Sequence, residues 1–209
     1  MNLKSLCIKT DLLFIKFDGE VIDHQNYLVA QCFANPNFFW GNLIVFKDAP
    51  KSGDLKNWKK LFKKHFTDPR IYHETFTWDQ ETLGDIKEFL DDGYKLEKNT
   101  ILTARKSDMK EPSKINDQIN IKIISSKKDW QSVVEVQVAA TNDYADFYPK
   151  QALLYQRMID QNMGHWFGAF IGERLVGSLG VFKEGKIGRF QIVSTHPDFG
   201  RQGICSNLV

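Results

Sequence analysis

Long apolar runs are missing from this sequence, and cysteine is scarce. The first 17 residues carry apolar side chains, but four charged ones interrupt them, which fits neither the core of a signal peptide nor a membrane-spanning helix. We therefore expect a cytoplasmic protein with no membrane partner. The cysteines, Cys7, Cys32 and Cys205, are far apart and include no CxxC pair, which argues against a disulfide framework and against a zinc site. We expect free thiols and no bound metal.

An excess of one charge is also missing. The 209 residues include 28 basic and 26 acidic ones, so no overall field attracts the chain to nucleic acid. A predicted helix over 54–66 does carry a row of lysines opposite its apolar face. Such a row is typical of a solvated outer face and, alternatively, of a helix that follows phosphates. Because no exposed aromatic residues are interleaved with the lysines, we expect no nucleic-acid partner.

The N-terminal half predicts a compact α/β unit over residues 1–106. Two strands form a hairpin, Asp54 caps a helix at its N-terminus, and Gly93 ends a second helix in a left-handed conformation. The order of strand, strand, helix, strand, helix and strand is typical of a mixed sheet. The expected elements are strands 27–33 and 38–46, helix 54–66, strand 70–78, helix 81–92 and strand 94–105.

Charged residues, serine and proline over 107–118 have the composition of a linker. A second α/β pattern fills 119–209, with its first helix opened by Ser125 or Ser126. The expected elements are strand 119–124, helices 128–140 and 150–162, a hairpin of strands 165–171 and 174–182, strand 187–196 and a helix from about 201.

The last strand, turn and helix contain the features of an anion site. Gly203 lets the backbone approach a ligand where the first amides of the helix are unpaired, and Arg201 adds a positive charge. Amides at a helix N-terminus carry partial positive charge, so they are suited to a pyrophosphate.

The run HPDFGRQGIC, residues 196–205, resembles the acetyl-coenzyme A loop of the GNAT superfamily. In that pattern a basic residue or Gln is followed by two variable residues, Gly, a variable residue and Gly or Ala. Gly203 takes the central glycine position and Cys205 the final small position. Gly200 stands where the basic residue is expected, and Arg201 follows it. The element order over 119–209 is similar to the first two thirds of that fold, and residues 1–106 are similar to a degenerate half of it.

The resemblance implies an α/β (α+β) fold with a mixed, mostly antiparallel sheet flanked by helices, and an N-acetyltransferase that uses acetyl-coenzyme A. The strand would hold the pantetheine arm through backbone hydrogen bonds, and one of its N–H groups would polarise the thioester carbonyl. The pantetheine residues would be Ile192, Val193, Ser194 and Thr195, and the pyrophosphate residues Arg201, Gln202, Gly203, Ile204, Cys205 and Ser206.

The general base is open. Relatives often carry a glutamate on this strand, whereas this chain offers Gln191, so a water-relayed base is one alternative. Glu184, Asp143 and Asp146 are the candidate carboxylates, and each also fits a plain surface position. His196 fits a turn better than a base, and Cys205 fits the small loop position better than a nucleophile, although a helix N-terminus favours a thiolate.

The acceptor amine, a small molecule or a peptide, would lie near the loop 141–149. There Tyr144, Phe147 and Tyr148, with Asp143 and Asp146, are suited to a cationic amine and equally to packing. A homodimer is also compatible with the sequence.

The sequence stops early in its last helix, without the further strands that the family uses to complete its sheet. We expect either a longer natural protein, or strands supplied by disordered residues or by a partner chain. The alternative function is a non-catalytic module that binds coenzyme A or another protein. We also expect Gly203→Glu to abolish cofactor binding and leave the fold intact.

Overall fold

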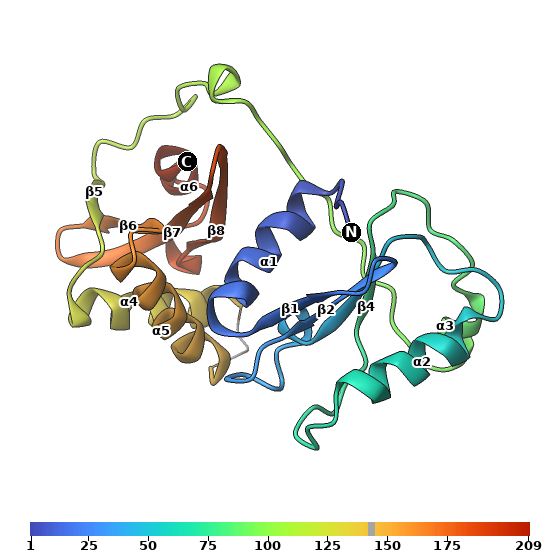
Figure 1. The fold of residues 1–209 in the computed structure, drawn as a ribbon. Coiled ribbons are helices and arrows are strands. Elements are labelled where there is room, and N and C mark those ends of the chain that lie inside the picture. Colours follow the sequence, from blue (N-terminus) through green and yellow to red (C-terminus); the bar gives the residue numbers. More distant parts are fainter. Residues whose placement is uncertain (142–144) are drawn as a thin grey trace. The chain divides into compact units, whose positions relative to one another are not determined.

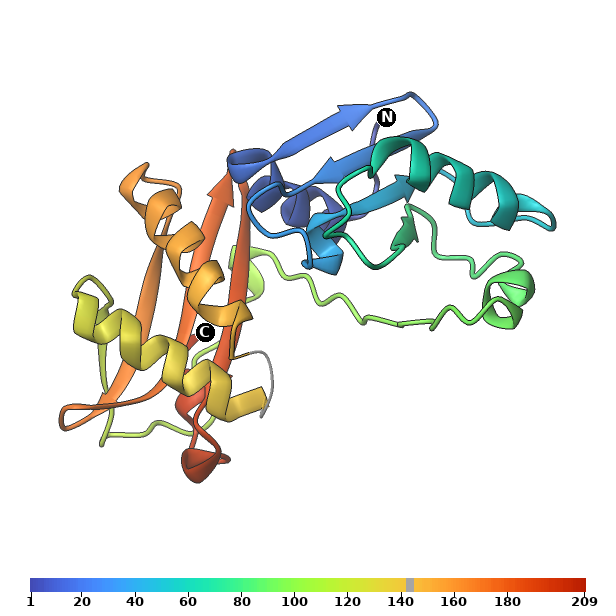
Figure 2. The same ribbon diagram turned by 90° about the horizontal axis from the view of Figure 1, so that it is seen from below.

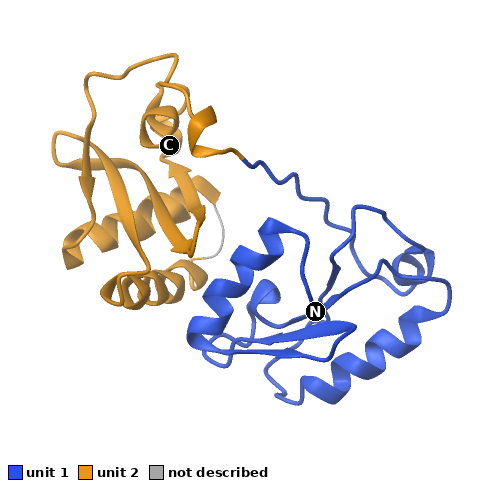
Figure 3. Cartoon of the chain, turned by 45° about the horizontal axis from the view of Figure 1, so that its top comes forward, with its two compact units in different colours: residues 1–103 blue, residues 104–209 orange. Residues whose placement is uncertain are grey.

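The computed structural model describes residues 1–141 and 145–209. The chain divides into two compact units, Met1–Thr103 and Ala104–Val209 (Figure 3). Each unit contains one four-stranded sheet with helices packed against it. Within the described residues, no helix combines the length and the apolar character that a bilayer crossing requires. The same residues contain no group of three His, Cys, Asp or Glu side chains placed to hold a metal ion.

The first unit has a sheet of order β1-β2-β3-β4, in which β3 and β4 are parallel and the other neighbours are antiparallel. The mixed sheet and the hairpin expected from the sequence are therefore present. The strands are β1 (Glu20–Asp23), β2 (Tyr27–Gln31), β3 (Leu43–Phe46) and β4 (Phe76–Trp78), and the helices are α1 (Leu6–Asp18), α2 (Asp54–His65) and α3 (Lys87–Asp91) (Figure 1).

Both faces of this sheet are covered. Helix α1 packs its Ile8, Leu12 and Ile15 on the face that carries Leu28 and Val45. Helices α2 and α3 cover the other face with an aromatic cluster, in which the Trp58 ring stacks on Phe46 at a centroid distance of 3.7 Å. Alternate side chains of β2 and β3 point to opposite faces of the sheet and pack in the two layers. These short strands are therefore mostly apolar.

Three expectations for this unit are corrected. Residues 94–105 form no strand, because they pair with no neighbouring strand and leave Leu102 91% exposed. Gly53, at φ 85°, precedes α2, and Asp54 is the first helical residue, with its carboxylate accepting a hydrogen bond of 2.8 Å from the N–H of Lys51. Helix α3 is shorter than 81–92, although Gly93 follows it at φ 95° as expected.

The second unit has a sheet of order β5-β6-β7-β8 in which every neighbouring pair is antiparallel. Its strands are β5 (Asn120–Ile123), β6 (Gly164–Ile171), β7 (Arg174–Glu184) and β8 (Ile187–Thr195). Its helices are α4 (Lys127–Thr141), α5 (Phe147–Asp160) and α6 (Ile204–Leu208). Helix α4 is capped by Ser126, whose hydroxyl accepts a hydrogen bond from the N–H of Asp129.

Helices α4 and α5 cover one face of this sheet (Figure 2). Trp166 of β6 is fully buried there, between Trp130 of α4 and Tyr155 of α5, with ring centroids 5.3 and 5.0 Å away. On the other face Ile204 of α6 packs against Ala169 of β6. The fold class is therefore α/β, with mainly antiparallel sheets flanked by helices.

Candidate functional site

Strand β8 contains a β-bulge. One residue of β7 lies opposite two residues of β8, Ile192 and Val193. The pairs on either side of the bulge are Gly180 with Gln191 and Ser178 with Ser194. Bulges re-aim backbone groups and are frequent beside active sites, so this position is the first structural candidate for a site.

Ile192 adopts a left-handed backbone conformation, with φ 44°. For a β-branched residue this conformation is an outlier, because its side chain crowds the backbone, and it costs on the order of 1–3 kcal/mol. Such strain persists only where the surrounding structure enforces it, and it concentrates at functional sites. The bulge is therefore held by the fold against the local preference of its own residue.

The outer edge of β8 has no strand partner among the described residues. The N–H of His196 donates a hydrogen bond of 2.9 Å to the carbonyl of Val176 on β7. Because successive residues of an antiparallel strand direct their backbone groups to opposite sides, Ser194 also faces β7, whereas Thr195 faces the open edge. The N–H of Thr195 is thus available to a ligand that lies along the strand.

The segment after β8 turns twice through left-handed conformations, at Arg201 (φ 60°) and Gly203 (φ 81°). Gly203 then precedes α6, in which Ile204 is buried and anchors the turn while Cys205 and Ser206 are exposed. No described residue accepts a hydrogen bond from the N–H groups of the first three helical residues. Those amides and the Arg201 guanidinium could hold a pyrophosphate.

Hydrogen bonds connect the turn to the segment that precedes β5. The side-chain amide of Asn207 donates to the carbonyls of Lys114 and Gly203, at 2.8 and 2.7 Å, and that of Asn116 donates to the carbonyl of Gln202 at 2.8 Å. These bonds hold the loop in one conformation. A loop that is already ordered loses less entropy when it binds a ligand.

The same packing corrects one expectation. A Cβ atom at Gly203 would lie 3.1 Å from the Lys114 carbonyl oxygen, in a conformation that side chains rarely adopt. Gly203→Glu would therefore disturb the loop itself, contrary to the expectation that it leaves the fold intact. Arg201, which is exposed, is the better position for a charge reversal.

Gln191, one residue before the bulge, is held by hydrogen bonds at both ends of its amide. Its Nε2 donates to the Tyr155 hydroxyl and its Oε1 accepts from the Arg189 Nε, each at 2.8 Å. The amide is therefore oriented toward α5. An amide does not take up a proton near neutral pH, so Gln191 can position other groups but cannot act as the base.

The candidate carboxylates are scattered. Glu184 ends β7 and pairs with Ile187 at the hairpin. Ile187 precedes the bulge residue Ile192 by five positions, which is about 16 Å along a strand at roughly 3.3 Å per residue. Asp146 is exposed at the start of α5 and caps no N–H group with its side chain. Asp143 lies outside the described residues. Neither described carboxylate makes a hydrogen bond with Gln191, whose side-chain partners are Arg189 and Tyr155.

The candidate acceptor aromatics lie in the first turn of α5. Phe147 and Tyr148 are in edge contact, with ring centroids 5.5 Å apart, and Tyr148 is buried. Tyr144 lies outside the described residues. Packing therefore already occupies much of the Tyr148 ring, and Phe147 is the more accessible of the two.

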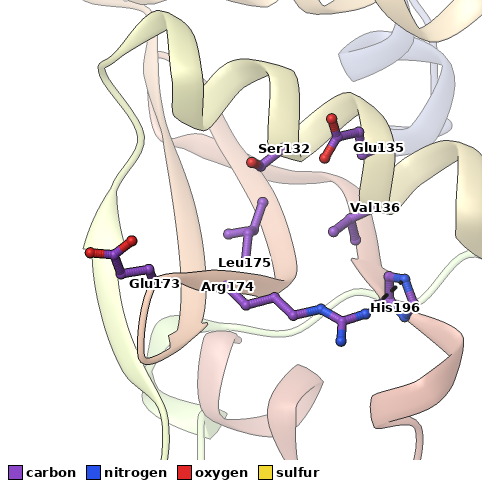
Figure 4. Close-up of a pocket in the computed structure, with 7 residues that line it drawn as sticks. All are labelled: Ser132, Glu135, Val136, Glu173, Arg174, Leu175 and His196. Atoms are coloured by element: carbon purple, nitrogen blue, oxygen red, sulfur yellow. Dashed lines mark hydrogen bonds between the residues drawn. The ribbon is translucent and has the colours of Figure 1, made fainter.

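His196, directly after β8, has a structural role in the following turn. Its Nδ1 accepts a hydrogen bond from the N–H of Asp198, and its Nε2 lies 3.4 Å from a guanidinium nitrogen of Arg174. Both His196 and Arg174 border a cavity beneath α4 (Figure 4). Sequence reasoning did not find this cavity, because its lining residues are far apart in the chain and match no motif.

No protein-family model matches this sequence, and no curated protein is similar to it in sequence. A conserved protein of unknown function from Staphylococcus epidermidis has a similar structure over most of the chain. The match covers 91% of this chain and 77% of that protein, with a TM-score of 0.67 and 16% sequence identity. It shows a shared fold across both units.

Solved acetyltransferases match a smaller share of the chain. A GNAT-family acetyltransferase of Desulfovibrio desulfuricans, described as putative, matches 43% of this chain and 60% of its own length, with a TM-score of 0.39 and 11% identity. The PaiA N-acetyltransferase of Thermoplasma acidophilum, solved with coenzyme A, matches 43% and 66%, with a TM-score of 0.37 and 19% identity. TM-scores this low carry no argument about the fold. The fold of this chain is therefore described from its own strands and helices alone.

Proposed function

We propose that the second unit binds acetyl-coenzyme A along the open edge of β8 and transfers its acetyl group to an amine. The observation that carries this proposal is the bulge at Ile192 and Val193 on an edge strand, followed directly by an ordered loop with unpaired amides. In that arrangement one strand edge offers hydrogen bonds to an extended arm, and the loop offers them to an anion.

When bound, acetyl-coenzyme A would supply an acetyl thioester for attack by the amine nitrogen. The N–H of Val193 would donate to the carbonyl oxygen as negative charge develops on it, and that of Thr195 would hold the pantetheine arm. The amides of Ile204, Cys205 and Ser206 and the Arg201 side chain would bind the pyrophosphate. As the new C–N bond forms and the C–S bond breaks, the amine loses a proton and the thiolate gains one.

Gln191 would orient the attacking group or a water that carries its proton, because an amide cannot accept that proton itself. The base would then be reached through water. An amide in place of a base at position 191 also favours the second candidate function, a non-catalytic module that binds coenzyme A. A protein that only binds the cofactor needs no base.

Calorimetric titration with acetyl-coenzyme A tests the site. We expect saturable binding that Arg201→Glu weakens at least tenfold, because an anion replaces a charge-assisted hydrogen-bond donor beside the pyrophosphate. Lys186→Glu, which makes the same charge change at the exposed β7–β8 hairpin, is the control and should bind as the parent chain does. Equal binding by all three would refute the site.

Release of free thiol from acetyl-coenzyme A in the presence of a panel of amines separates the two candidates. Amine-dependent release supports the transferase. Tight binding of acetyl-coenzyme A with no release above the uncatalysed rate supports the module.

A further inference from the structure

A cavity of about 180 Å³ lies in the second unit between α4, the β6–β7 turn and the end of β8. Its floor is apolar, and its walls carry charges of both signs. The lining residues are Ser132, Glu135 and Val136 of α4, Glu173, Arg174 and Leu175 of the turn and β7, and His196 after β8 (Figure 4). Val136 and Leu175 are buried and belong to the floor.

The positive wall is held in place. A guanidinium nitrogen of Arg174 lies 3.4 Å from His196 Nε2 and 3.4 Å from an Asp198 carboxylate oxygen, and the guanidinium carbon lies 4.8 Å from the centre of the Phe199 ring. These contacts fix the direction of the side chain. The other N–H groups of Arg174 donate to no described residue, so they are available to a carboxylate.

The negative charge of the lining belongs to Glu135 of α4. Ser132 and Glu135 are three residues apart on the helix and therefore share a face. Neither side chain makes a hydrogen bond or an ion pair with a described residue, and Glu135 forms no ion pair with Arg174 although both border the cavity. Glu135 and Arg174 thus carry opposite charges in one cavity and do not pair with each other.

We propose that this cavity binds a small zwitterion of the α-amino acid type. The ligand's carboxylate contacts Arg174 and His196, its ammonium group contacts Glu135 and Ser132, and its side chain lies on the apolar floor. A guanidinium is suited to a carboxylate because its parallel N–H groups match the two oxygens. A ligand without an ammonium group leaves Glu135 with no partner of opposite charge among the described residues.

The cavity has room for such a ligand. A volume of about 180 Å³ is enough for a small amino acid such as alanine. His196 follows the bulge residue Ile192 by four positions, which is about 13 Å along a strand at roughly 3.3 Å per residue. His196 directly follows Thr195, but none of the side chains assigned to the zwitterion is assigned to acetyl-coenzyme A, so this inference does not depend on the proposed transfer.

Titration of the full chain with alanine and its derivatives tests the ligand class. We expect alanine to bind saturably, and N-acetylalanine, which lacks the ammonium group, and alaninamide, which lacks the carboxylate, to bind at least tenfold more weakly. No binding of alanine, or binding of either blocked derivative as tight as that of alanine, would overturn the proposal.

Variants then test the two walls. Glu135→Gln and Arg174→Gln should each weaken alanine binding at least tenfold, because each removes one of the paired charges. Glu173→Gln is the control: Glu173 borders the cavity, but its side chain points away from Arg174 and His196 in Figure 4, and its loss should change affinity less than twofold. Circular dichroism confirms that each variant is folded. Unchanged affinity in folded Glu135→Gln and Arg174→Gln would refute the assigned contacts.

Discussion

The Gln191 amide nitrogen donates a hydrogen bond of 2.8 Å to the phenol oxygen of Tyr155, and this bond joins the bulged strand β8 to helix α5. Tyr155 is 2% exposed and its ring stacks on Trp166, so the residue that accepts this bond belongs to the core of the second unit. It fixes the side chain that precedes the strained Ile192.

Tyr155→Phe should lower the free energy of unfolding by about 1 kcal/mol, because it leaves the Gln191 amide without its acceptor and keeps the ring. Urea unfolding measures the change. Tyr72→Phe is the control, since the Tyr72 side chain is 73% exposed and its hydroxyl bonds to no described residue. Equal loss in both variants would contradict the role given to the Tyr155 hydroxyl.

Gln191→Glu should raise the rate of the proposed acetyl transfer by about tenfold or more near neutral pH, because it places a carboxylate base beside the bulge. The rate should then fall as pH decreases through the pKa of the new carboxyl group. A pH profile of kcat/KM for parent and variant measures this. An unchanged rate and profile would show that position 191 does not lie near the reacting amine.

Gly180→Ala should destabilise the protein by about 1–3 kcal/mol through overpacking. A Cβ atom there would lie 2.6 Å from a ring atom of Trp166, which is fully buried between two other aromatic side chains and cannot move aside. Gly188→Ala in β8 is the matched control, because its nearest contact would be 4.0 Å away. Urea unfolding of the two variants should show the loss only in the first.

Trp58→Ala should cost about 3–5 kcal/mol, because it removes a buried ring that stacks on Phe46 and touches Phe89. Leu102→Ala, at a position that is 91% exposed, should change stability by less than about 0.5 kcal/mol. Thermal unfolding compares them. A small effect of the first substitution would mean that the aromatic cluster is not the core of the first unit.

Acid should destabilise the first unit through His65. Burial, and then the nearby His24 and Lys64, lower the pKa of His65 below its ordinary value of 6.5. The neutral ring is favoured in the folded state, so its contribution is fully present above pH 6.5 and is lost as pH falls through the lower, folded-state pKa. NMR titration of the ring protons should give a pKa below 6.5 for His65.

The melting temperature should fall over the same pH range, and less so in His65→Asn. A pKa for His65 at or above its ordinary value would reverse the expected sign.

Much of the second unit followed from the sequence. The alternating and helical patterns predicted its four strands and its two long helices in order, with Ser125 or Ser126 as the cap, because each of these elements has an apolar period of its own. Helix α1 of the first unit was missed. It has buried side chains on several faces, including Leu12, Leu13, Phe14 and Ile15, so no single apolar stripe marks it.

The sequence alone determined the order of strands and long helices in the second unit, the glycine turn after α3 and the resemblance of the loop around Gly203, because these depend on neighbouring residues. Only the tertiary structure decided the rest. Residues 94–105 form no strand because pairing depends on a neighbour, and Ile192 is left-handed because the sheet enforces a conformation that isoleucine disfavours. The cavity beneath α4 exists because folding brings Glu135, Arg174 and His196 together from three distant segments.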